Sequence, residues 1–106
     1  SNNKITGQVP RSLWTLPNLY SVDLSYNSFV GFERSREHGL SSSLRNLFGS
    51  NNNLTGKIPS FICKLPSLSI LDFSNNNLSG SIPLCMGKLK TTLSVLNLGH
   101  NRLSGG

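Results

Sequence analysis

The sequence contains no alanine, and both charged and apolar residues are scarce in it. Apolar residues make up 36% and charged residues 13% of the 106 positions, and the apolar share is below that of most globular domains. Without alanine, and with 13 Asn and 10 Gly, the chain is a poor source of long helices. No apolar run approaches the ~20 residues that a membrane-spanning helix needs. The 18 Leu are too many for a disordered chain, so ordered polar groups, with Asn the obvious candidate, must supplement the core.

Basic residues outnumber acidic ones. Ten Lys and Arg against four Asp and Glu give a net charge of +6. The basic residues are scattered, with no basic run or basic helix, which argues against nucleic-acid binding. A solvated, soluble face explains the charge most simply, and an acidic partner surface, such as pectin or an acidic protein, is the alternative. The sequence opens at Ser1 in the middle of a pattern and without a start Met, so we expect a piece of a longer protein.

One pattern of spaced residues, L-x-x-L-x-L-x-x-N-x-L-x-G with substitutions of like kind, recurs four times. Its copies are 25, 24 and 25 residues apart and start at Leu19, Leu44, Leu68 and Leu93. A truncated copy covers 3–7, and three segments continue as Gly-x-(Ile/Val)-Pro, namely 7–10, 56–59 and 80–83. A fixed period of this length is typical of a solenoid, in which each coil packs on its neighbours.

Each position of the pattern has a physical role. The first, fourth and sixth residues point into the coil, and the fourth and sixth share one face of a short strand. Strands of successive coils then form a parallel sheet. The ninth residue is Asn, whose amide can donate and accept at once and so satisfy backbone groups of its own and the adjacent coil. We expect a ladder formed by Asn3, Asn27, Asn52, Asn76 and Asn101.

The segment 71–83, Leu-Asp-Phe-Ser-Asn-Asn-Asn-Leu-Ser-Gly-Ser-Ile-Pro, resembles the plant-type extracellular leucine-rich repeat almost fully. The irregular segment 27–33 and the segments 58–63 and 82–86, each with Ile-Pro before a Cys, are similar to those of plant receptor-like proteins. The resemblance implies an α/β-type horseshoe segment with a short parallel β-sheet on the concave face. Loops, turns and 3-10 segments are expected on the convex face. The implied single array of about four coils, without capping domains, comprises 1–18, 19–43, 44–67, 68–92 and 93–106.

Two departures from the repeat bear on the fold. Gly49 occupies a sixth position, where Leu is expected, so that coil is underfilled unless a neighbouring side chain covers it. The copy 19–43 lacks Ile-Pro and continues with charged residues from Phe32 to Leu40. We expect it not to form the strand of the other copies but a charged loop on the side or back, within 31–43. Such a loop is either a contact site or a tolerated irregularity.

The two cysteines and the two glycosylation sequons depend on the resemblance for their interpretation. Cys63 and Cys85 lie on the convex side of adjacent coils, within reach of a bridge, and the extracellular resemblance favours a disulfide over two buried free thiols. The sequons begin at Asn53 and Asn77. Both Asn follow the ladder Asn and face outward, as in a secreted glycoprotein.

The sequence predicts no enzyme. No Cys–His or Ser–His–Asp group can be assembled from it. Asp23 and Asp72 share the fifth position two coils apart, so they lie ~10 Å apart, which approaches the carboxylate spacing of an inverting glycosidase. However, a solvent-open strand face lacks the burial that an acid catalyst needs, and Phe48 lies between the two carboxylates. We also expect no metal site and no cofactor.

The outward positions of the strands are therefore the candidate binding face. Most of these residues are small and polar, but Phe48, Ile70 and Val95 are apolar residues on adjacent coils. They form either a contact patch or a contact with a neighbouring loop or glycan. The candidate concave-face residues are Asp23, Tyr26, Phe48, Asn51, Ile70, Asp72, Asn75, Val95, Asn97 and His100.

The resemblance implies an extracellular segment of a cell-surface receptor-like protein. Such proteins bind a peptide, protein or glycan ligand, are anchored by one membrane span C-terminal to the repeats, and signal in defence or development through a partner receptor kinase. A secreted polygalacturonase inhibitor-like protein is the alternative, which the basic charge would suit because pectin is acidic. A wall-structural or ice-binding repeat protein is a third possibility, which the irregular outer rows disfavour.

Overall fold

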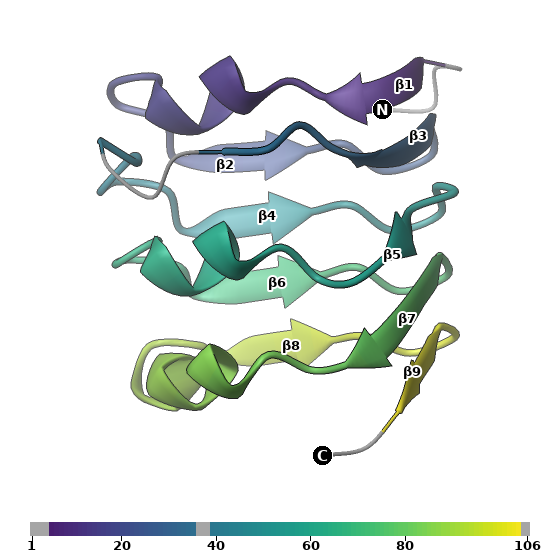
Figure 1. The fold of residues 1–106 in the computed structure, drawn as a ribbon. Coiled ribbons are helices and arrows are strands. Elements are labelled where there is room, and N and C mark those ends of the chain that lie inside the picture. The colour runs from purple at the N-terminus through teal and green to yellow at the C-terminus, as the bar shows by residue number, and fades with distance from the viewer. Residues whose placement is uncertain (1–4, 36–38, 105–106) are drawn as a thin grey trace.

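The computed structural model describes residues 5–35 and 39–104 and shows a stack of flattened coils that runs from top to bottom in Figure 1. Three short 3-10 helices alternate with nine short strands along the chain in this part. The strands are β1 (Thr6–Val9), β2 (Ser21–Asp23), β3 (Ser28–Phe32), β4 (Asn46–Phe48), β5 (Thr55–Gly56), β6 (Ile70–Asp72), β7 (Asn77–Ser81), β8 (Val95–Asn97) and β9 (Arg102–Ser104). The 3-10 helices are η1 (Arg11–Thr15), η2 (Ser60–Lys64) and η3 (Leu84–Thr91).

The main sheet is parallel and contains one strand from each copy of the repeat. Its order is β2-β4-β6-β8, and the strands are in register, so that the fourth positions Val22, Leu47, Leu71 and Leu96 align. Backbone hydrogen bonds continue beyond the strands, as from Tyr26 N to Ser50 O at 3.1 Å. The sheet is therefore one rigid surface with side chains of adjacent coils side by side.

The opposite side of each coil carries the 3-10 helices and a second set of strands. In Figure 1 the helices lie in front of the main sheet, and β5, β7 and β9 lie beside it. The strands pair in parallel as β1 with β3 and as β5-β7-β9. Each 3-10 helix follows a proline, Pro10, Pro59 or Pro83, because proline fixes φ and supplies no donor that a helix start would leave unpaired.

The core consists of the leucines and phenylalanines of the inward positions. The central coils are the best covered, with Leu44, Leu47, Leu68 and Leu71 fully buried. At the last coil Leu96 is half exposed. A solenoid buries an apolar face only where the next coil covers it, so burial is greatest in the central coils and lower toward both ends of the stack.

The ninth-position asparagines hydrogen-bond along the stack. Asn52 Nδ2 donates to the carbonyls of Gly49 and Ser50 in its own coil and of Leu24 in the preceding one, and its Oδ1 accepts the N–H of Phe29. Asn76 and Asn101 repeat this arrangement one and two coils further along. Asn3 lies outside the described residues. The polar ladder thus satisfies backbone groups that the narrow coil could not otherwise bury.

Phe73 occupies the space that Gly49 leaves in the core. A Cβ added at Gly49 would lie 2.9 Å from two ring carbons of Phe73, which is fully buried. The ring of Phe73 also contacts that of Phe32, with 5.5 Å between centroids. The coil is therefore filled from its neighbour, and the glycine is the small partner of a large ring.

The irregular copy departs from our expectation. We expected that it could not form the strand that follows the ladder Asn, but β3 runs to Phe32 and pairs with β1 through Val9. The strand persists because Phe32 replaces the usual Ile as the inward apolar residue, and its ring packs in the core against Phe61 and Phe73. The irregularity begins only at Glu33, whose N–H donates to Val9 O at 2.9 Å.

Candidate functional site

The concave face is formed by two rows of outward side chains on the main sheet. The third-position row is Ser21, Asn46, Ile70 and Val95, and the fifth-position row is Asp23, Phe48, Asp72 and Asn97. The register places the members of each row on neighbouring strands, about 4.8 Å apart. The two rows therefore lie on one surface, and the backbone pairing of the strands fixes the distance between neighbouring members of a row.

The three apolar residues of this face lie on the successive strands β4, β6 and β8. Phe48 pairs with Asp72 in the fifth row, and Ile70 pairs with Val95 in the third. Phe48 and Ile70 are partly exposed, and Val95 is 47% exposed. Because they remain partly exposed, these side chains offer apolar surface for a contact.

The acidic and amide residues of the fifth row also hold the turns that follow their strands. Asp72 Oδ1 accepts hydrogen bonds from Ser74 N at 3.0 Å and Ser74 Oγ at 2.7 Å. Asp23 accepts from Ser25 N, and the hydrogen bonds from Ser25 lower the pKa of the Asp23 carboxyl. A carboxyl with a lowered pKa is ionised at neutral pH and cannot act as a general acid.

The eighth-position residues have left-handed backbones. The φ angles of Tyr26, Asn51, Asn75 and His100 lie between 56° and 58°. Asn tolerates this conformation, but a bulky residue such as Tyr is strained in it. Tyr26 is nevertheless 58% exposed, so packing of its side chain can offset little of the strain. Retained strain at an exposed aromatic residue is a feature of functional positions.

Replacing Tyr26 with Asn is therefore expected to stabilise the fold by about 1 kcal/mol. Asn is the residue at the same position of the next two coils, where it adopts the same φ. Urea unfolding of the variant and the parent measures the difference, with Asn75→Tyr as the reciprocal change. A Tyr26→Asn variant less stable than the parent, or an Asn75→Tyr variant more stable, would show that strain at this position is negligible.

Sequence reasoning missed part of this surface. Tyr20, at the second position of its coil, is 59% exposed and lies one residue before β2. The residues at the same position of the other copies are polar, namely Arg45, Ser69 and Ser94. An aromatic residue at this position was therefore the sequence signal that could have identified Tyr20. A hollow on the convex side, bordered by η1 and η2, was also missed, because it depends on how one coil departs from the others.

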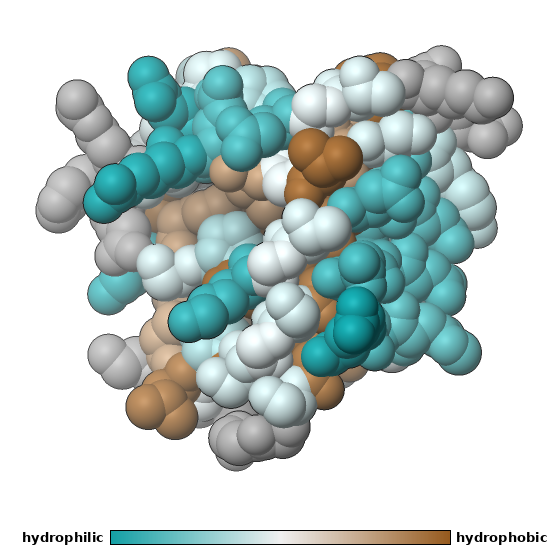
Figure 2. Space-filling model, turned by 45° about the vertical axis from the view of Figure 1, so that its right-hand side comes forward, coloured by the Kyte–Doolittle hydropathy of each residue, from teal (hydrophilic) through white to brown (hydrophobic). Residues whose placement is uncertain are grey.

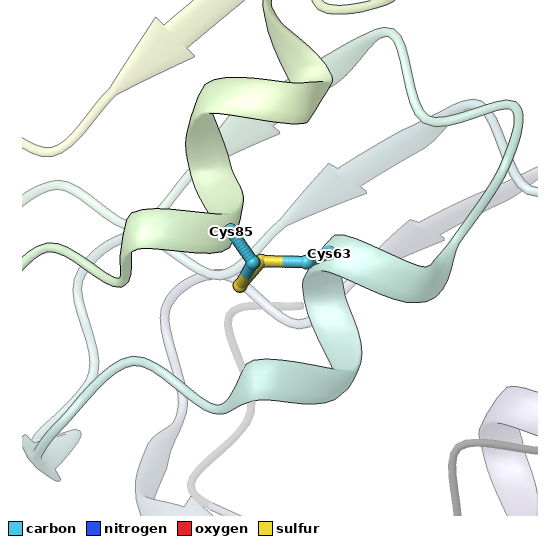
Figure 3. The surroundings of a disulfide bond; sticks show 2 residues. All are labelled: Cys63 and Cys85. Carbon is cyan, nitrogen blue, oxygen red and sulfur yellow. A yellow bond between two sulfur atoms is a disulfide. The ribbon is translucent and has the colours of Figure 1, made fainter.

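The convex side carries the disulfide. Cys63 in η2 and Cys85 in η3 are joined, with their Cα atoms 5.8 Å apart (Figure 3). The bond closes a loop across adjacent coils, and a loop of this length is worth about 3 kcal/mol in the chain-entropy account. The two 3-10 helices are thereby fixed to each other on the side away from the main sheet.

Two other kinds of site are absent from residues 5–35 and 39–104. No group of three or more His, Cys, Asp or Glu side chains is placed to hold a metal ion there. In the same residues, no helix has both the length and the apolar character required to cross a bilayer.

Comparison with known proteins agrees with this architecture. The Leucine Rich Repeat family model matches residues 43–65 and 67–89. Receptor-like protein 32 of Arabidopsis thaliana is 69% identical over 110 residues, which cover the whole of this chain and 13% of the relative. Receptor-like protein 35 of the same plant is 65% identical over all of this chain and 12% of the relative. The chain thus spans about an eighth of the length of these relatives.

Solved structures of plant receptor ectodomains have the same fold. The Arabidopsis receptor kinase HAESA, in complex with the peptide hormone IDA and the co-receptor SERK1, superposes with a TM-score of 0.82 and 37% identity, over 97% of this chain and 17% of HAESA. The ectodomain of the receptor kinase GASSHO1/SCHENGEN3, in complex with CASPARIAN STRIP INTEGRITY FACTOR 2, gives 0.83 and 35% over 94% of this chain and 12% of that one.

The chain folds as a leucine-rich repeat solenoid. Within that class, it is similar in sequence to segments of plant receptor-like proteins and in structure to plant receptor ectodomains.

Proposed function

We propose that this chain is a ligand-binding segment of an extracellular receptor and that its concave sheet is the binding face. The observation that carries the proposal is the in-register sheet, which holds Phe48, Ile70 and Asp72 on neighbouring strands facing one way. The peptide hormone in the HAESA complex and the factor bound in the GASSHO1/SCHENGEN3 complex support a peptide or protein ligand here. The co-receptor in the HAESA complex supports a partner receptor kinase, and defence or developmental signalling is the corresponding role.

The protein acts by binding and not by catalysis in this proposal. Its candidate carboxylates lie on an open face, and Asp23 has a lowered pKa because of the hydrogen bonds from Ser25. Four strands at ~4.8 Å spacing extend about 15 Å. A standard protein interface buries about 800 Å² on each partner, so this segment holds only part of a binding site. We place the segment outside the cell, with membrane attachment through another part of the protein that carries it.

The binding face is tested with two substitutions in the secreted ectodomain that carries this chain. Phe48→Ala removes the central aromatic residue, and Asp72→Asn removes the charge but keeps an acceptor for Ser74. Each is expected to weaken binding of the cognate peptide or co-receptor about tenfold, the effect of losing a central contact. Calorimetry with the purified partner measures the change.

Lys64→Gln is the matched control, because Lys64 is exposed on the convex side. It is expected to leave both affinity and secretion unchanged. If Lys64→Gln abolished binding while the concave substitutions were silent, the charged segment from Glu33 would become the better candidate for the binding site.

The sequons form a separate part of the proposal. Asn53 and Asn77 are exposed and lie beside the main sheet, in the segments that lead to or begin β5 and β7. We infer that both carry N-linked glycans in secreted protein. Mass spectrometry should show a glycan on both Asn residues before glycosidase treatment and none after it. Unmodified Asn at both sites before treatment would contradict this.

A further inference from the structure

The convex side has a hollow beside the irregular copy of the repeat, whose described residues form no 3-10 helix. The coils on either side contribute η1 and η2, and the irregular copy between them continues from β3 through Glu33 to Ser35 without regular structure. The resulting hollow has a volume of about 1020 Å³. Figure 2 shows it at the upper left as a depression with a tan floor below a teal border. It is therefore a gap in the row of 3-10 helices, one coil wide.

The floor of the hollow is aromatic and well supported. Phe32 and Phe61 line it together with Pro59, and their ring centroids lie 6.0 Å apart. Trp14 packs behind them, 5.2 Å from Phe61 and 6.3 Å from Phe32. Trp14 is fully buried and Phe61 is only 3% exposed, so packing holds these rings in place. Binding of an apolar side chain on the floor would therefore cost little conformational entropy.

The rim of the hollow is polar and carries more positive than negative charge. Arg11 and Arg34 line it and are exposed. Among the described residues neither has a salt bridge. Glu33 is the acidic residue of the lining, and its carboxylate accepts the backbone N–H of Arg11 at 3.0 Å. With two guanidinium groups against one carboxylate, on a chain of net charge +6, the hollow favours an acidic occupant.

We propose that this hollow docks an acidic peptide segment of a protein partner. An aromatic or large aliphatic side chain of that segment would rest on Phe32, the partly exposed ring of the floor, and its acidic neighbours would face Arg11 and Arg34. The hollow is lined by residues of η1 and η2, and these helices lie on the opposite side of the coils from the main sheet (Figure 1). It can therefore be occupied together with the concave face, and its test is independent of the function proposed above.

The test uses fluorescence anisotropy of a labelled peptide, acetyl-Glu-Glu-Phe-Glu-Glu-amide, with the secreted ectodomain that carries this chain. Two matched peptides replace Phe with Ala or all Glu with Gln. We expect saturable binding of the first peptide and at least about tenfold weaker binding of the other two, because each lacks one of the two recognised features. Equal binding of the Gln peptide would refute the acidic occupant, and an absence of binding at millimolar peptide would refute the site.

Four variants then locate the binding. Ser12→Trp fills the hollow from exposed η1 and should abolish binding, and Arg11→Gln with Arg34→Gln should weaken it about tenfold. Glu33→Gln keeps an acceptor for Arg11 N but removes the opposing charge, so it should tighten binding by about two- to fivefold. Lys64→Gln is the control for an exposed convex charge outside the hollow and should change nothing.

Circular dichroism of each variant confirms that it is folded before its affinity is compared. A loss with Lys64→Gln equal to that of the arginine pair would mean diffuse attraction to the basic chain and would overturn the proposal. Unchanged binding in folded Ser12→Trp would overturn it as well. Loss of peptide binding in Phe48→Ala would place the peptide on the concave face instead.

Discussion

Asn52→Ala is expected to destabilise the fold by about 1–3 kcal/mol, because it leaves the buried N–H of Phe29 without its acceptor. Asn52 is buried. Its side chain accepts from Phe29 N at 3.1 Å and donates to three carbonyls in two coils. Urea unfolding followed by circular dichroism measures the loss in the midpoint and the free energy of unfolding.

Asn53→Ala is the matched control for this prediction. Asn53 is the next residue and is exposed, and its backbone N–H, which the substitution keeps, donates to Phe29 O. In protein without glycans, Asn53→Ala should change the free energy of unfolding by no more than about 0.5 kcal/mol. Similar losses in the two variants would mean that the buried ladder contributes no more than an exposed amide.

Gly49→Leu, which restores the usual residue of the repeat, is expected to destabilise the fold by about 3 kcal/mol or more. A Cβ at Gly49 already lies 2.9 Å from the ring of Phe73, and three further carbons of leucine would have no space. The ring cannot move aside freely, because it contacts Phe32 in the core. Thermal or urea unfolding gives the size of the effect.

Phe73→Leu in the same chain supplies the compensating change. Alone it leaves a cavity and should cost about 1–2 kcal/mol, while the double variant should be more stable than Gly49→Leu alone. The two sites are in contact, so an interaction energy of about 1–3 kcal/mol is expected from the double-mutant cycle. Strictly additive effects would show that the glycine is not the small partner of the Phe73 ring.

The period predicted the architecture because it reflects packing that every coil repeats. Leucines at inward positions, such as Leu47 and Leu71, must meet their equivalents one coil away, and Asn at the ninth position follows from the backbone groups left at the turn. The gap at Gly49 was visible in the sequence for the same reason. Its filling by Phe73 was not, since a ring can extend toward either neighbouring coil.

The site was less predictable where one residue has two roles. Outward position alone marked Asp23 and Asp72 as binding candidates, but their oxygens also hold the turns after the strands. The repeat pattern is lost after Gly31, and the sequence therefore predicted that the usual strand would not form there. In the structure Phe32 continues β3 and packs against the ring of Phe73. The convex hollow could not be foreseen, because it arises from helices of two other coils.

The most direct test of the binding face is site-specific photo-crosslinking in the intact receptor. A photoreactive phenylalanine analogue is placed at Phe48 on the concave sheet, and in a second variant at Leu84, which is 93% exposed at the start of η3. The account predicts a crosslink to the bound ligand or co-receptor from position 48 and none from position 84, with the product identified by mass spectrometry. Crosslinking from position 84 with none from position 48 would contradict the assignment of the concave sheet as the binding face.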